Sequence, residues 1–431
     1  MKHLIIILSI LLSFTINSCS PYKDSSSSTT TSDTTTTNET TTTDDTTTTD
    51  SITNSTWTKQ LGTTTSDYGY TVTTDSSGNI YVTGSTYGHL DGNTNSGKSD
   101  IFLVKYNSSG TKQWTKQLGT SSTDGGSGVT SDSSDNIYVT GYTYGHLDGN
   151  TNSGQGDIFL VKYNSSGTKQ WTKQLGSYGD DFGYSVTTDS SGNIYVSGDT
   201  TSAYPGLDGK DDTNPKNRLS RDLFLVKYTS SGKRKWLKQL KTPATDRYGY
   251  LKIDSSGNIY MGGHTEGGLN GCTYGRSDIF LIKFNSSGKI KWINAFKMCG
   301  LPVSALQLGS SELEYGRSIT IDSLGNIYMT GPTQGNLGWW EKNKGSFDIF
   351  LTKINSSGTV KWIRQLGSSE SEDAYGVTID SSDNIYVTGN TQGDLDGNTN
   401  LGGECEVGRG KIQLCNDIFL VKYNSSGTKQ W

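Results

Sequence analysis

Tryptophan recurs along this chain in one local motif, and the spacing of that motif constrains the fold more than any other feature. Trp57 and Trp114 lie 57 residues apart, and equivalent tryptophans follow at positions 171, 236, 292, 362 and 431. Each interval holds four short runs rich in Val, Ile, Tyr, Phe and Thr, which are typical of β-strands. We name these runs strands A, B, C and D of a unit; in the first unit they start at Tyr68, Asn79, Asp100 and near Trp114.

Short turns are predicted between strands A and B and between strands C and D. In the first unit these turns are Asp75-Ser-Ser-Gly78 and Asn107-Ser-Ser-Gly110. Both patterns are typical of a type I turn followed by a left-handed residue, a conformation that Gly adopts without steric cost. Units two and six have Asp135 and Asp383 at the Gly position, and Asp is one of the few residues tolerated there. Each unit is therefore predicted to be an antiparallel four-stranded meander.

Strand C is apolar on both faces, as residues 101–104 (Ile-Phe-Leu-Val) show. A sheet that is covered on both sides is what the stacked blades of a β-propeller require. A parallel β-helix is the competing repeat architecture, but its coils are much shorter and lack two hairpin turns each. The 54 Gly, 6 Pro and 10 % aromatic residues also suit an all-β protein with many turns. We therefore expect an all-β fold, a β-propeller of four-stranded antiparallel blades.

The motif at residues 75–84, followed by residues 100–106 and Trp114, resembles the bacterial β-propeller repeat family known as SBBP repeats. The resemblance extends over nearly all of the chain after Trp57, with six complete sets of strands A, B and C. It implies a propeller, and the family name implies seven blades. It implies little about function, because propellers have many different roles.

The two ends of the repeat array lead to a prediction of how the ring closes. Residues 57–62 match the second half of a strand D, and residues 427–431 match the first half of another. Pairing an N-terminal strand with the last blade would remove an exposed sheet edge. We expect six blades over residues 56–431, with residues 56–61 beside residues 419–423. The alternative is a seventh blade beyond Trp431, which would leave a gap between the first and last blades.

The N-terminal residues have the pattern of an export signal. Lys2 precedes an apolar run over residues 4–12, which is too short to span a membrane as a helix. Residues 16–19 (Ile-Asn-Ser-Cys) resemble a bacterial lipobox, in which Cys19 would be acylated and become the mature N-terminus. Asn17 departs from the usual small or apolar residue. We expect a lipoprotein signal peptide at residues 1–19 and a disordered Ser/Thr-rich tether at residues 20–55.

Insertions in the repeat predict which face of the propeller binds a ligand. Units three and six have longer connections between strands B and C, and unit five begins with a longer connection from strand D to strand A. In an antiparallel meander the B–C and D–A connections leave from one face, which we call the loop face. Long loops grouped on a rigid scaffold are common binding sites, although surface loops also tolerate insertions without any function.

Four cysteines follow Cys19, and all belong to the long loops. Their positions are Cys272, Cys299, Cys405 and Cys415. An exported chain meets oxidising conditions, so we expect bonds from Cys272 to Cys299 and from Cys405 to Cys415, with four free thiols as the alternative.

A motif of alternating oxygen-bearing residues raises the question of calcium. It occurs in three B–C loops, as Asp91, Asn93 and Asn95, as Asp148, Asn150 and Asn152, and as Asp396, Asn398 and Asn400. The Gly stands one place later than in an EF-hand, and no bidentate Glu follows. Turn formation is the main interpretation and calcium binding the secondary one; no other cofactor is expected.

Residues that could carry chemistry are few. His89 and His146 hold equivalent places in units one and two, so they are candidate contacts on the loop face, although a repeated turn role is favoured. Trp339 and Trp340 lie in the B–C loop of unit five, where they either contact a ligand or pack beneath a neighbouring loop. Carboxylates near the D–A connections are interpreted as a solvated acidic rim; they are Glu312, Glu314, Glu370, Glu372 and Asp373.

Two classes of function remain open after these observations. The first is a surface-anchored binding protein that is exported, held in a bacterial membrane by its lipid, and bound to an unknown protein or glycan through the loop face. The second is a propeller enzyme, a polysaccharide lyase or hydrolase with facing Asp, His or Arg at the channel mouth. The near-identical units favour the first class, because active sites are usually asymmetric. The net charge of -5 argues against nucleic acid.

Overall fold

The computed structural model describes the chain from residue 58 to residue 431 with internal gaps. Residues 202–205, 210–219, 241–243, 268, 270–275, 296–308, 338–341, 401–403 and 407–411 lie outside the described part, as do residues 1–57. The predicted signal peptide, with Cys19, and the predicted tether therefore lie outside it. No helix in the described part is long and apolar enough to cross a membrane.

The described strands form six antiparallel sheets in chain order. The first three sheets are β1 (Asp67–Thr74), β2 (Ile80–Thr86), β3 (Asp100–Tyr106) and β4 (Lys112–Leu118); β5 (Asp124–Ser131), β6 (Ile137–Thr143), β7 (Asp157–Tyr163) and β8 (Lys169–Leu175); and β9 (Asp181–Thr188), β10 (Ile194–Thr201), β11 (Arg221–Tyr228) and β12 (Arg234–Leu240). The last three are β13 (Asp246–Ile253), β14 (Ile259–Thr265), β15 (Asp278–Phe284) and β16 (Ile290–Ala295); β17 (Ser318–Ile321), β18 (Ile327–Thr333), β19 (Asp348–Ile354) and β20 (Val360–Leu366); and β21 (Glu372–Ile379), β22 (Ile385–Thr391) and β25 (Asp417–Tyr423). Two 3-10 turns, η1 (Leu90–Gly92) and η2 (Leu147–Gly149), and a small hairpin of β23 (Glu404–Glu406) and β24 (Ile412–Leu414) lie in B–C loops.

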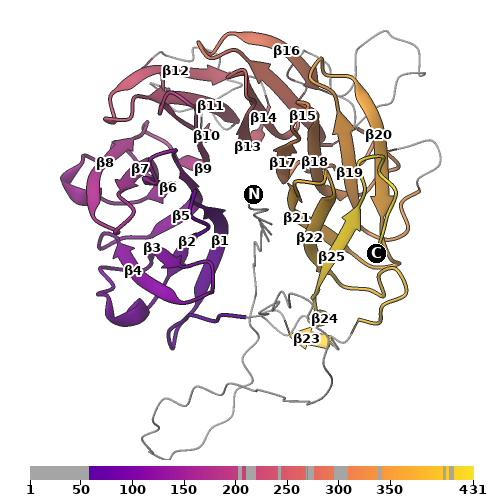
Figure 1. Cartoon of the computed structure of the whole chain (residues 1–431), viewed down its shortest axis with the longest axis horizontal. Helices are drawn as coiled ribbons and strands as arrows, with labels where there is room; N and C mark the ends of the chain where they lie inside the picture. The colour runs from indigo at the N-terminus through magenta and orange to yellow at the C-terminus, as the bar shows by residue number, and fades with distance from the viewer. Residues whose placement is uncertain are drawn as a thin grey trace, which may run out of the picture.

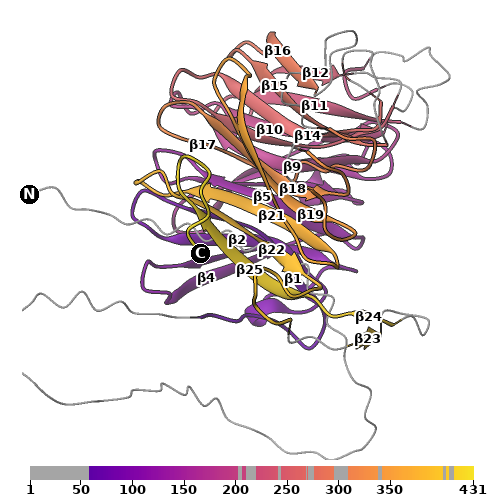
Figure 2. The same cartoon turned by 90° about the vertical axis from the view of Figure 1, so that its right-hand side faces the viewer.

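The sheets stand around a common axis as the blades of a propeller. Strand A of each unit is innermost and strand D outermost, so that β1, β5, β9, β13, β17 and β21 surround the middle (Figure 1). Seen from the side, the blades are stacked with their strands inclined to one another (Figure 2). The predictions of an all-β propeller and of six blades are confirmed.

The A–B and C–D turns have the predicted left-handed residue. Gly78 and Gly110 have φ values of 77° and 79°, and Asp135 and Asp383 take the same region with 55° and 60°. The first turn is also held by side chains, because Asp75 accepts hydrogen bonds from the Asn79 amide and from the Tyr81 hydroxyl at 2.9 Å. The same Asp–Tyr bond recurs in every unit, with Tyr138, Tyr195, Tyr260, Tyr328 and Tyr386 as donors.

Apolar side chains fill the spaces between neighbouring blades. Ile101 and Leu103 of β3 pack against the second blade, where they meet Val129 and Val139. Equivalent clusters lie between each further pair of neighbouring blades. Strand C of the second blade, β7, is buried on both faces, because Phe159 and Val161 pack against the first blade and Ile158 and Leu160 pack against the third. The sequence pattern of strand C is thus explained by contact with a blade on either side.

The predicted pairing of residues 56–61 with residues 419–423 is wrong for the part that the structure describes. The sixth sheet ends at β25, and no strand formed by residues 58–61 pairs with it. Leu61 packs instead on the first blade, beside Leu90 and Phe102. At the other end, the backbone N–H of Lys422 donates to Trp431, and its carbonyl accepts from Gln430. Residues 430 and 431 therefore pair with part of the edge of β25 that faces away from β22.

Among the residues that the structure describes, a gap therefore separates the first and last blades, and β1–β4 stand apart from β25 in Figure 1. Ile418 and Leu420 of β25 are 68 % and 46 % exposed, whereas Ile101 and Leu103 at the same positions of the first unit are 2 % and 1 % exposed. No residue of β1 is buried either. The two surfaces that would meet at this interface are left partly open.

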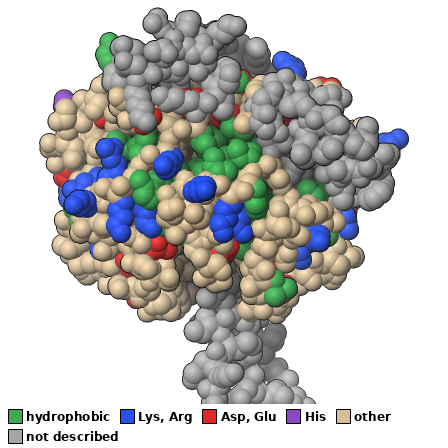
Figure 3. Space-filling view, turned by 90° about the horizontal axis from the view of Figure 1, so that it is seen from above, with side chains coloured by type: hydrophobic (Ala, Val, Ile, Leu, Met, Phe, Trp, Pro, Cys, Tyr) green, Lys and Arg blue, Asp and Glu red, His purple; other side chains and the backbone are tan. Residues whose placement is uncertain are grey.

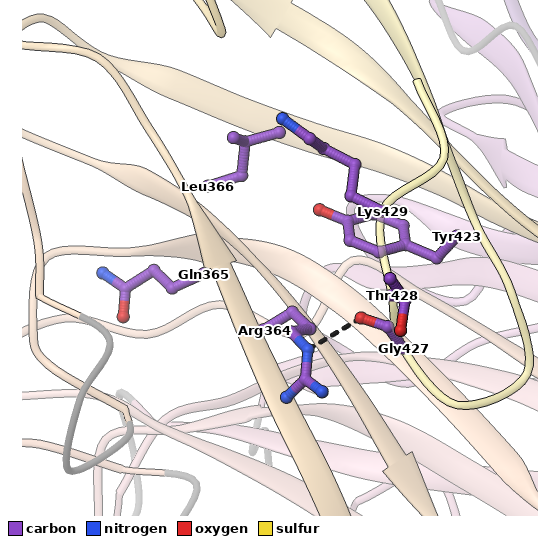
Figure 4. Close-up of a pocket in the computed structure, with 7 residues that line it drawn as sticks. All are labelled: Arg364, Gln365, Leu366, Tyr423, Gly427, Thr428 and Lys429. Carbon is purple, nitrogen blue, oxygen red and sulfur yellow. Dashed lines mark hydrogen bonds between the residues drawn. The ribbon is translucent and has the colours of Figure 1, made fainter.

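A groove of about 400 Å³ lies at the outer edge of the sixth blade. It lies between β20 and the C–D turn after β25, where Arg364 donates a hydrogen bond to the carbonyl of Gly427 at 2.7 Å (Figure 4). Gly427 faces the ring of Trp362, as Gly167 faces Trp114 in the first two blades. The groove therefore borders the usual contact between a C–D turn and strand D of the preceding blade, and we assign it no function.

Basic residues cover the outer strands. Lys235 and Lys238 of β12 and Lys291 of β16 are exposed, and Figure 3 shows Lys and Arg side chains spread over this side of the molecule. Strand D is the outermost strand of each blade, and exposed charges on such an edge oppose pairing with another sheet. This explains the basic residues of strand D without a ligand.

Candidate binding site at the loop face

The B–C and D–A connections lie together on one face, as the strand order requires. Lys98 in the first B–C loop donates a backbone hydrogen bond to Ser122 in the following D–A connection at 3.1 Å. Ser346 and Glu370 make the same contact between the fifth and sixth units at 2.7 Å. The loop face is thus a continuous surface made by consecutive units.

His89 and His146 have a local role in these loops. The Nδ1 atom of His89 accepts a hydrogen bond from the backbone of Asn95 at 3.0 Å, and His146 accepts one from Asn152 at 3.1 Å. Both rings precede a 3-10 turn and are exposed. The repeated turn role is the one that the geometry supports, and the two rings belong to separate blades.

The calcium hypothesis finds no support in the geometry. Asp91, Asp148 and Asp396 all have left-handed φ values, of 54°, 56° and 56°, and form ion pairs with Lys112, Lys169 and Lys429. The Lys112 ammonium lowers the pKa of Asp91.

The Asn side chains of the same motif bond to their own loops. Asn93, Asn150 and Asn398 donate to the carbonyls of the residues three places earlier, and Asn95, Asn152 and Asn400 also bond to nearby backbone. No group of three or more His, Cys, Asp or Glu that could hold a metal occurs among the described residues. These residues stabilise turns.

Several predicted residues fall outside the described part of the chain. They are Cys19, Cys272, Cys299, Trp339 and Trp340, and the side chain of Cys405. Pairing of β23 with β24 sets residue 404 opposite residue 414, next to Cys405 and Cys415. The bonds Cys272–Cys299 and Cys405–Cys415 stay predictions.

The interpretation of the acidic residues as a solvated rim is wrong for three of them. Glu314 and Glu372 are fully buried at the start of strand A. Glu314 accepts hydrogen bonds from Ser310 of the D–A connection and from Thr333 of strand B. The first residue of strand A is acidic in every unit, and burial raises the pKa of Asp181, the equivalent residue of the third unit, to about 7. These acids attach the D–A connection to the blade. Asp373 is the third residue for which the interpretation as a solvated rim is wrong, and it lies in the cluster described next.

Beside the axis, at the loop-face end of the innermost strands, the units differ from one another. The residue after the first acid of strand A is Tyr, Gly, Phe, Arg, Tyr or Asp, at positions 68, 125, 182, 247, 315 and 373. Its neighbour on strand B is Ser, Tyr, Asp, His, Pro or Asn, at positions 85, 142, 199, 264, 332 and 390. Residues from blades four, five and six come together here; we call them the axis cluster, which comprises Tyr248, His264, Tyr315, Arg317, Asp373 and Tyr375.

Arg317 is the centre of the axis cluster. Its guanidinium carbon lies 5.5, 5.9 and 5.6 Å from the ring centroids of Tyr248, Tyr315 and Tyr375. Its Nη2 atom lies 3.1 Å from Oδ2 of Asp373. Guanidinium groups stack favourably on aromatic faces, and an ion pair with a carboxylate fixes their orientation. Burial raises the pKa of Asp373 to about 6, although Arg317 opposes this shift.

His264 lies beneath this surface and is only 2 % exposed. Its ring stands between Tyr248 and Tyr315, with centroid distances of 5.2 and 4.7 Å. Burial, together with the nearby Arg317 and Arg247, lowers the pKa of His264 to about 3. The imidazole is therefore neutral at physiological pH, in a positive local potential.

Three buried polar atoms of the axis cluster have no hydrogen-bond partner within the described residues. They are Nδ1 of His264, Nε of Arg317 and Oδ1 of Asp373. A buried polar atom left without a partner costs about 1–3 kcal/mol. Such atoms grouped in one place are unusual in a folded protein and identify a site that water or a ligand completes.

Tyr248 reaches the axis cluster through a strained backbone. Four other units have Gly at the same place of strand A, at positions 69, 126, 183 and 316; a Cβ atom on Gly126 or Gly316 would lie 2.6 Å from the preceding blade. Tyr248 adopts φ 77° instead, and the strand bulges between Arg247 and Tyr250. A backbone of this kind costs about 1–3 kcal/mol and is common at functional sites. Asp199, which is paired with Arg221, accepts the Tyr248 N–H at 3.4 Å.

The axis cluster is not among the predicted sites, because the units resemble one another closely in sequence and His264 has no predicted role. Aligning the units at the start of strand A and the end of strand B would have shown the signal, because the order Gly-Tyr is reversed to Tyr248-Gly249 and because Arg317 and Asp373 stand where Tyr is common.

Comparisons with known proteins agree with the repeat. The model of the beta-propeller repeat family, SBBP, matches at five positions, residues 56–91, 113–148, 170–205, 305–338 and 361–396. The chain is 24 % identical over 87 % of its length to an uncharacterized WD repeat-containing protein of Acanthamoeba polyphaga mimivirus, and 25 % identical over 44 % of its length to the regulatory protein FlaEY of Caulobacter vibrioides. It covers 34 % and 20 % of these relatives.

Solved structures are similar at low identity. An ulvan lyase bound to a saccharide has a TM-score of 0.45 and 14 % identity, over 84 % of this chain and 81 % of that one. The Pan2 WD40 domain of Neurospora crassa has a TM-score of 0.40 and 9 % identity, over 74 % of this chain and 75 % of that one.

The low pKa of His264 predicts how stability depends on pH. The folded value of about 3 lies below the ordinary value of 6.5, so the unfolded chain binds a proton that the folded chain does not. The stability that the neutral ring provides is present above pH 6.5 and is lost as the pH falls from about 6.5 to 3. Relative to His264→Phe, the wild-type free energy of unfolding should fall by about 3 kcal/mol between pH 7 and pH 4. Denaturant unfolding of both proteins across this range measures it, and parallel pH profiles would contradict the burial of a neutral ring.

Proposed function

We propose that this protein is an exported, lipid-anchored β-propeller that binds a protein or glycan ligand through its loop face. One observation carries the proposal: the units are alike in their turns and blade contacts but differ beside the axis at the loop-face end. A scaffold needs only the repeated contacts. The departures from the repeat bring partly exposed aromatic and charged side chains together, which is typical of a binding site.

The anchor rests on the N-terminal sequence. A short apolar run followed by Cys19 suits export and acylation, and the polar residues 20–55 suit a tether that holds the propeller away from a membrane surface. A propeller held in this way can present its loop face to partners outside the membrane, and we place the protein at the outer membrane or cell surface.

An enzyme acting on a polysaccharide is the second candidate, and one observation favours it. Facing His, Arg and Asp from several blades at the channel mouth are what such an enzyme would need, and His264, Arg317 and Asp373 come from three blades. Binding is favoured because Arg317 and Asp373 neutralise each other and His264 lies beneath the surface. Release of new chain ends from a bound polymer would show that the protein is an enzyme and not only a binding protein.

Blocking one face at a time tests the binding function. Tyr178, in a D–A connection of the loop face, is 72 % exposed, and Leu324, in an A–B turn of the opposite face, is 79 % exposed. Each is replaced by Cys and coupled to a bulky maleimide polymer, with the wild type treated in the same way. Binding of the full-length protein is measured on arrays of surface glycans and matrix proteins.

We expect the polymer at position 178 to reduce binding at least tenfold and the polymer at position 324 to leave it unchanged. The reverse result would place the ligand on the turn face. Absence of binding to every component would contradict a surface-binding role.

The anchor has its own test. Cys19→Ala removes the only thiol that the lipobox-like motif offers for acylation, so the variant should leave the membrane fraction for the soluble fraction of its host bacterium. Fractionation and mass measurement of the mature N-terminus check this expectation. Unchanged membrane partitioning of the variant would be incompatible with a lipid anchor at Cys19.

A further inference from the structure

We propose that the axis cluster binds a sugar ring that bears a carboxylate, so that the ligand of this propeller is an acidic glycan. The inference rests on the proposed loop-face binding function and deepens it by naming the class of ligand.

The unpartnered atoms of the axis cluster differ in hydrogen-bonding character. Nε of Arg317 can only donate, Oδ1 of ionised Asp373 can only accept, and Nδ1 of neutral His264 does one or the other according to its tautomer. A ligand group that satisfies all of them must both donate and accept. Hydroxyl groups do so, and a sugar ring presents several at close spacing.

Aromatic faces surround these polar atoms. Tyr248, Tyr315 and Tyr375 lie around the Arg317 guanidinium, and Tyr184 adds a further ring 5.1 Å from Tyr248. Flat aromatic surfaces with adjacent planar polar groups suit the C–H faces and the hydroxyl rim of a sugar ring. A purely ionic ligand would not need the aromatic surface, and a purely apolar one would leave the polar atoms unsatisfied.

The charge balance favours an acidic sugar. Arg317 is paired with Asp373, and Arg221 is paired with Asp199. Arg247, opposite His264 on the neighbouring strand, is exposed. Glu266 and Arg276 act on Tyr315 with opposite sign, and the two ion pairs are neutral, so Arg247 is the additional positive charge beside the axis cluster. Arg247 and Arg317 both act on His264. A carboxylate is the group on a sugar ring that this potential attracts.

Access to the axis cluster is partial, as a binding site requires. The side chains of Arg317 and Asp373 are 26 % and 24 % exposed, while His264 forms the floor. The strained Tyr248 has no role in the repeat, because other units build the same blade with Gly at its place. Contact with a ligand gives a reason for a Tyr side chain at this strained position.

Two variants test the proposal in the full-length protein. Arg317→Gln removes the charge at nearly constant size. Tyr248→Gly gives this position the residue that the first and third units have there, so it removes the ring and the strain of its φ of 77°, while Gly249, with φ 63°, keeps the residue that its backbone requires. Arg234→Gln, an exposed change on the outer strand β12, is the matched control for general loss of positive charge.

The probes are polygalacturonate, alginate and hyaluronan, with neutral dextran of similar length as the comparison, and calorimetry gives the affinities. We expect at least one of the three acidic polymers to bind and dextran to bind at least tenfold more weakly. Arg317→Gln and Tyr248→Gly should each weaken binding at least tenfold, and Arg234→Gln should not. Tyr248→Gly should keep the cooperative thermal unfolding of the wild type, so that its loss of binding reflects the missing ring and not a loss of the fold.

Failure of all three acidic polymers overturns the proposal, as does a loss in Arg234→Gln equal to that in Arg317→Gln. If the arrays show loop-face binding to a protein while the acidic polymers fail, the binding function stands and only the ligand class is wrong. Release of new chain ends from a bound polymer supports a saccharide ligand and assigns the cluster to the enzyme candidate.

Discussion

Apolar contact between neighbouring blades is the interaction on which the rest of this structure depends. A single four-stranded meander has two apolar faces and cannot bury either of them alone. Side chains equivalent to Ile101 and Leu103 on one blade fill the space beside Val129 and Val139 on the next, and the contact recurs along the array. Positions beside the axis are held in place because these contacts fix each blade relative to its neighbours.

The turns add a second repeated constraint. In every unit a Tyr of strand B donates its hydroxyl to the Asp of the A–B turn and lies against the Trp of strand D, as Tyr195 does with Asp189 and Trp236. A buried hydroxyl needs a partner, and the Asp provides it while ordering the turn backbone. The turn face and the blade interior therefore tolerate little change. Variation is confined to the loop face, where the axis cluster and the long loops both lie.

Much of the fold could be predicted from the sequence, because its determinants are local. Turn residues such as Gly78 and Asp135 and the doubly apolar strand C specify blades without knowledge of the tertiary structure. Ring closure could not be predicted, because the motif of residues 57–62 does not show whether Leu61 packs on the first blade or reaches the last one.

For the candidate site, the sequence predicted the face of the propeller but not the residues that form the site. His89 and the Asp-Gly-Asn motifs looked distinctive but serve their own loops. Arg317, Asp373 and His264 lie far apart in the sequence, and each is unremarkable by itself. They become a site only because the register of three blades brings them together, and that register is a property of the packed ring.

The most direct test of this account compares the same substitution at equivalent positions of the first and sixth units. Leu103 and Leu420 occupy the same place on strand C, but Leu103 is 1 % exposed between two blades and Leu420 is 46 % exposed at the gap. If blade contact is what stabilises the ring, Leu103→Ala should lower the free energy of unfolding by about 3 kcal/mol and Leu420→Ala by less than about 1 kcal/mol. Equal losses in denaturant unfolding would contradict the account, because they would mean that the sixth blade is covered in solution as fully as the first.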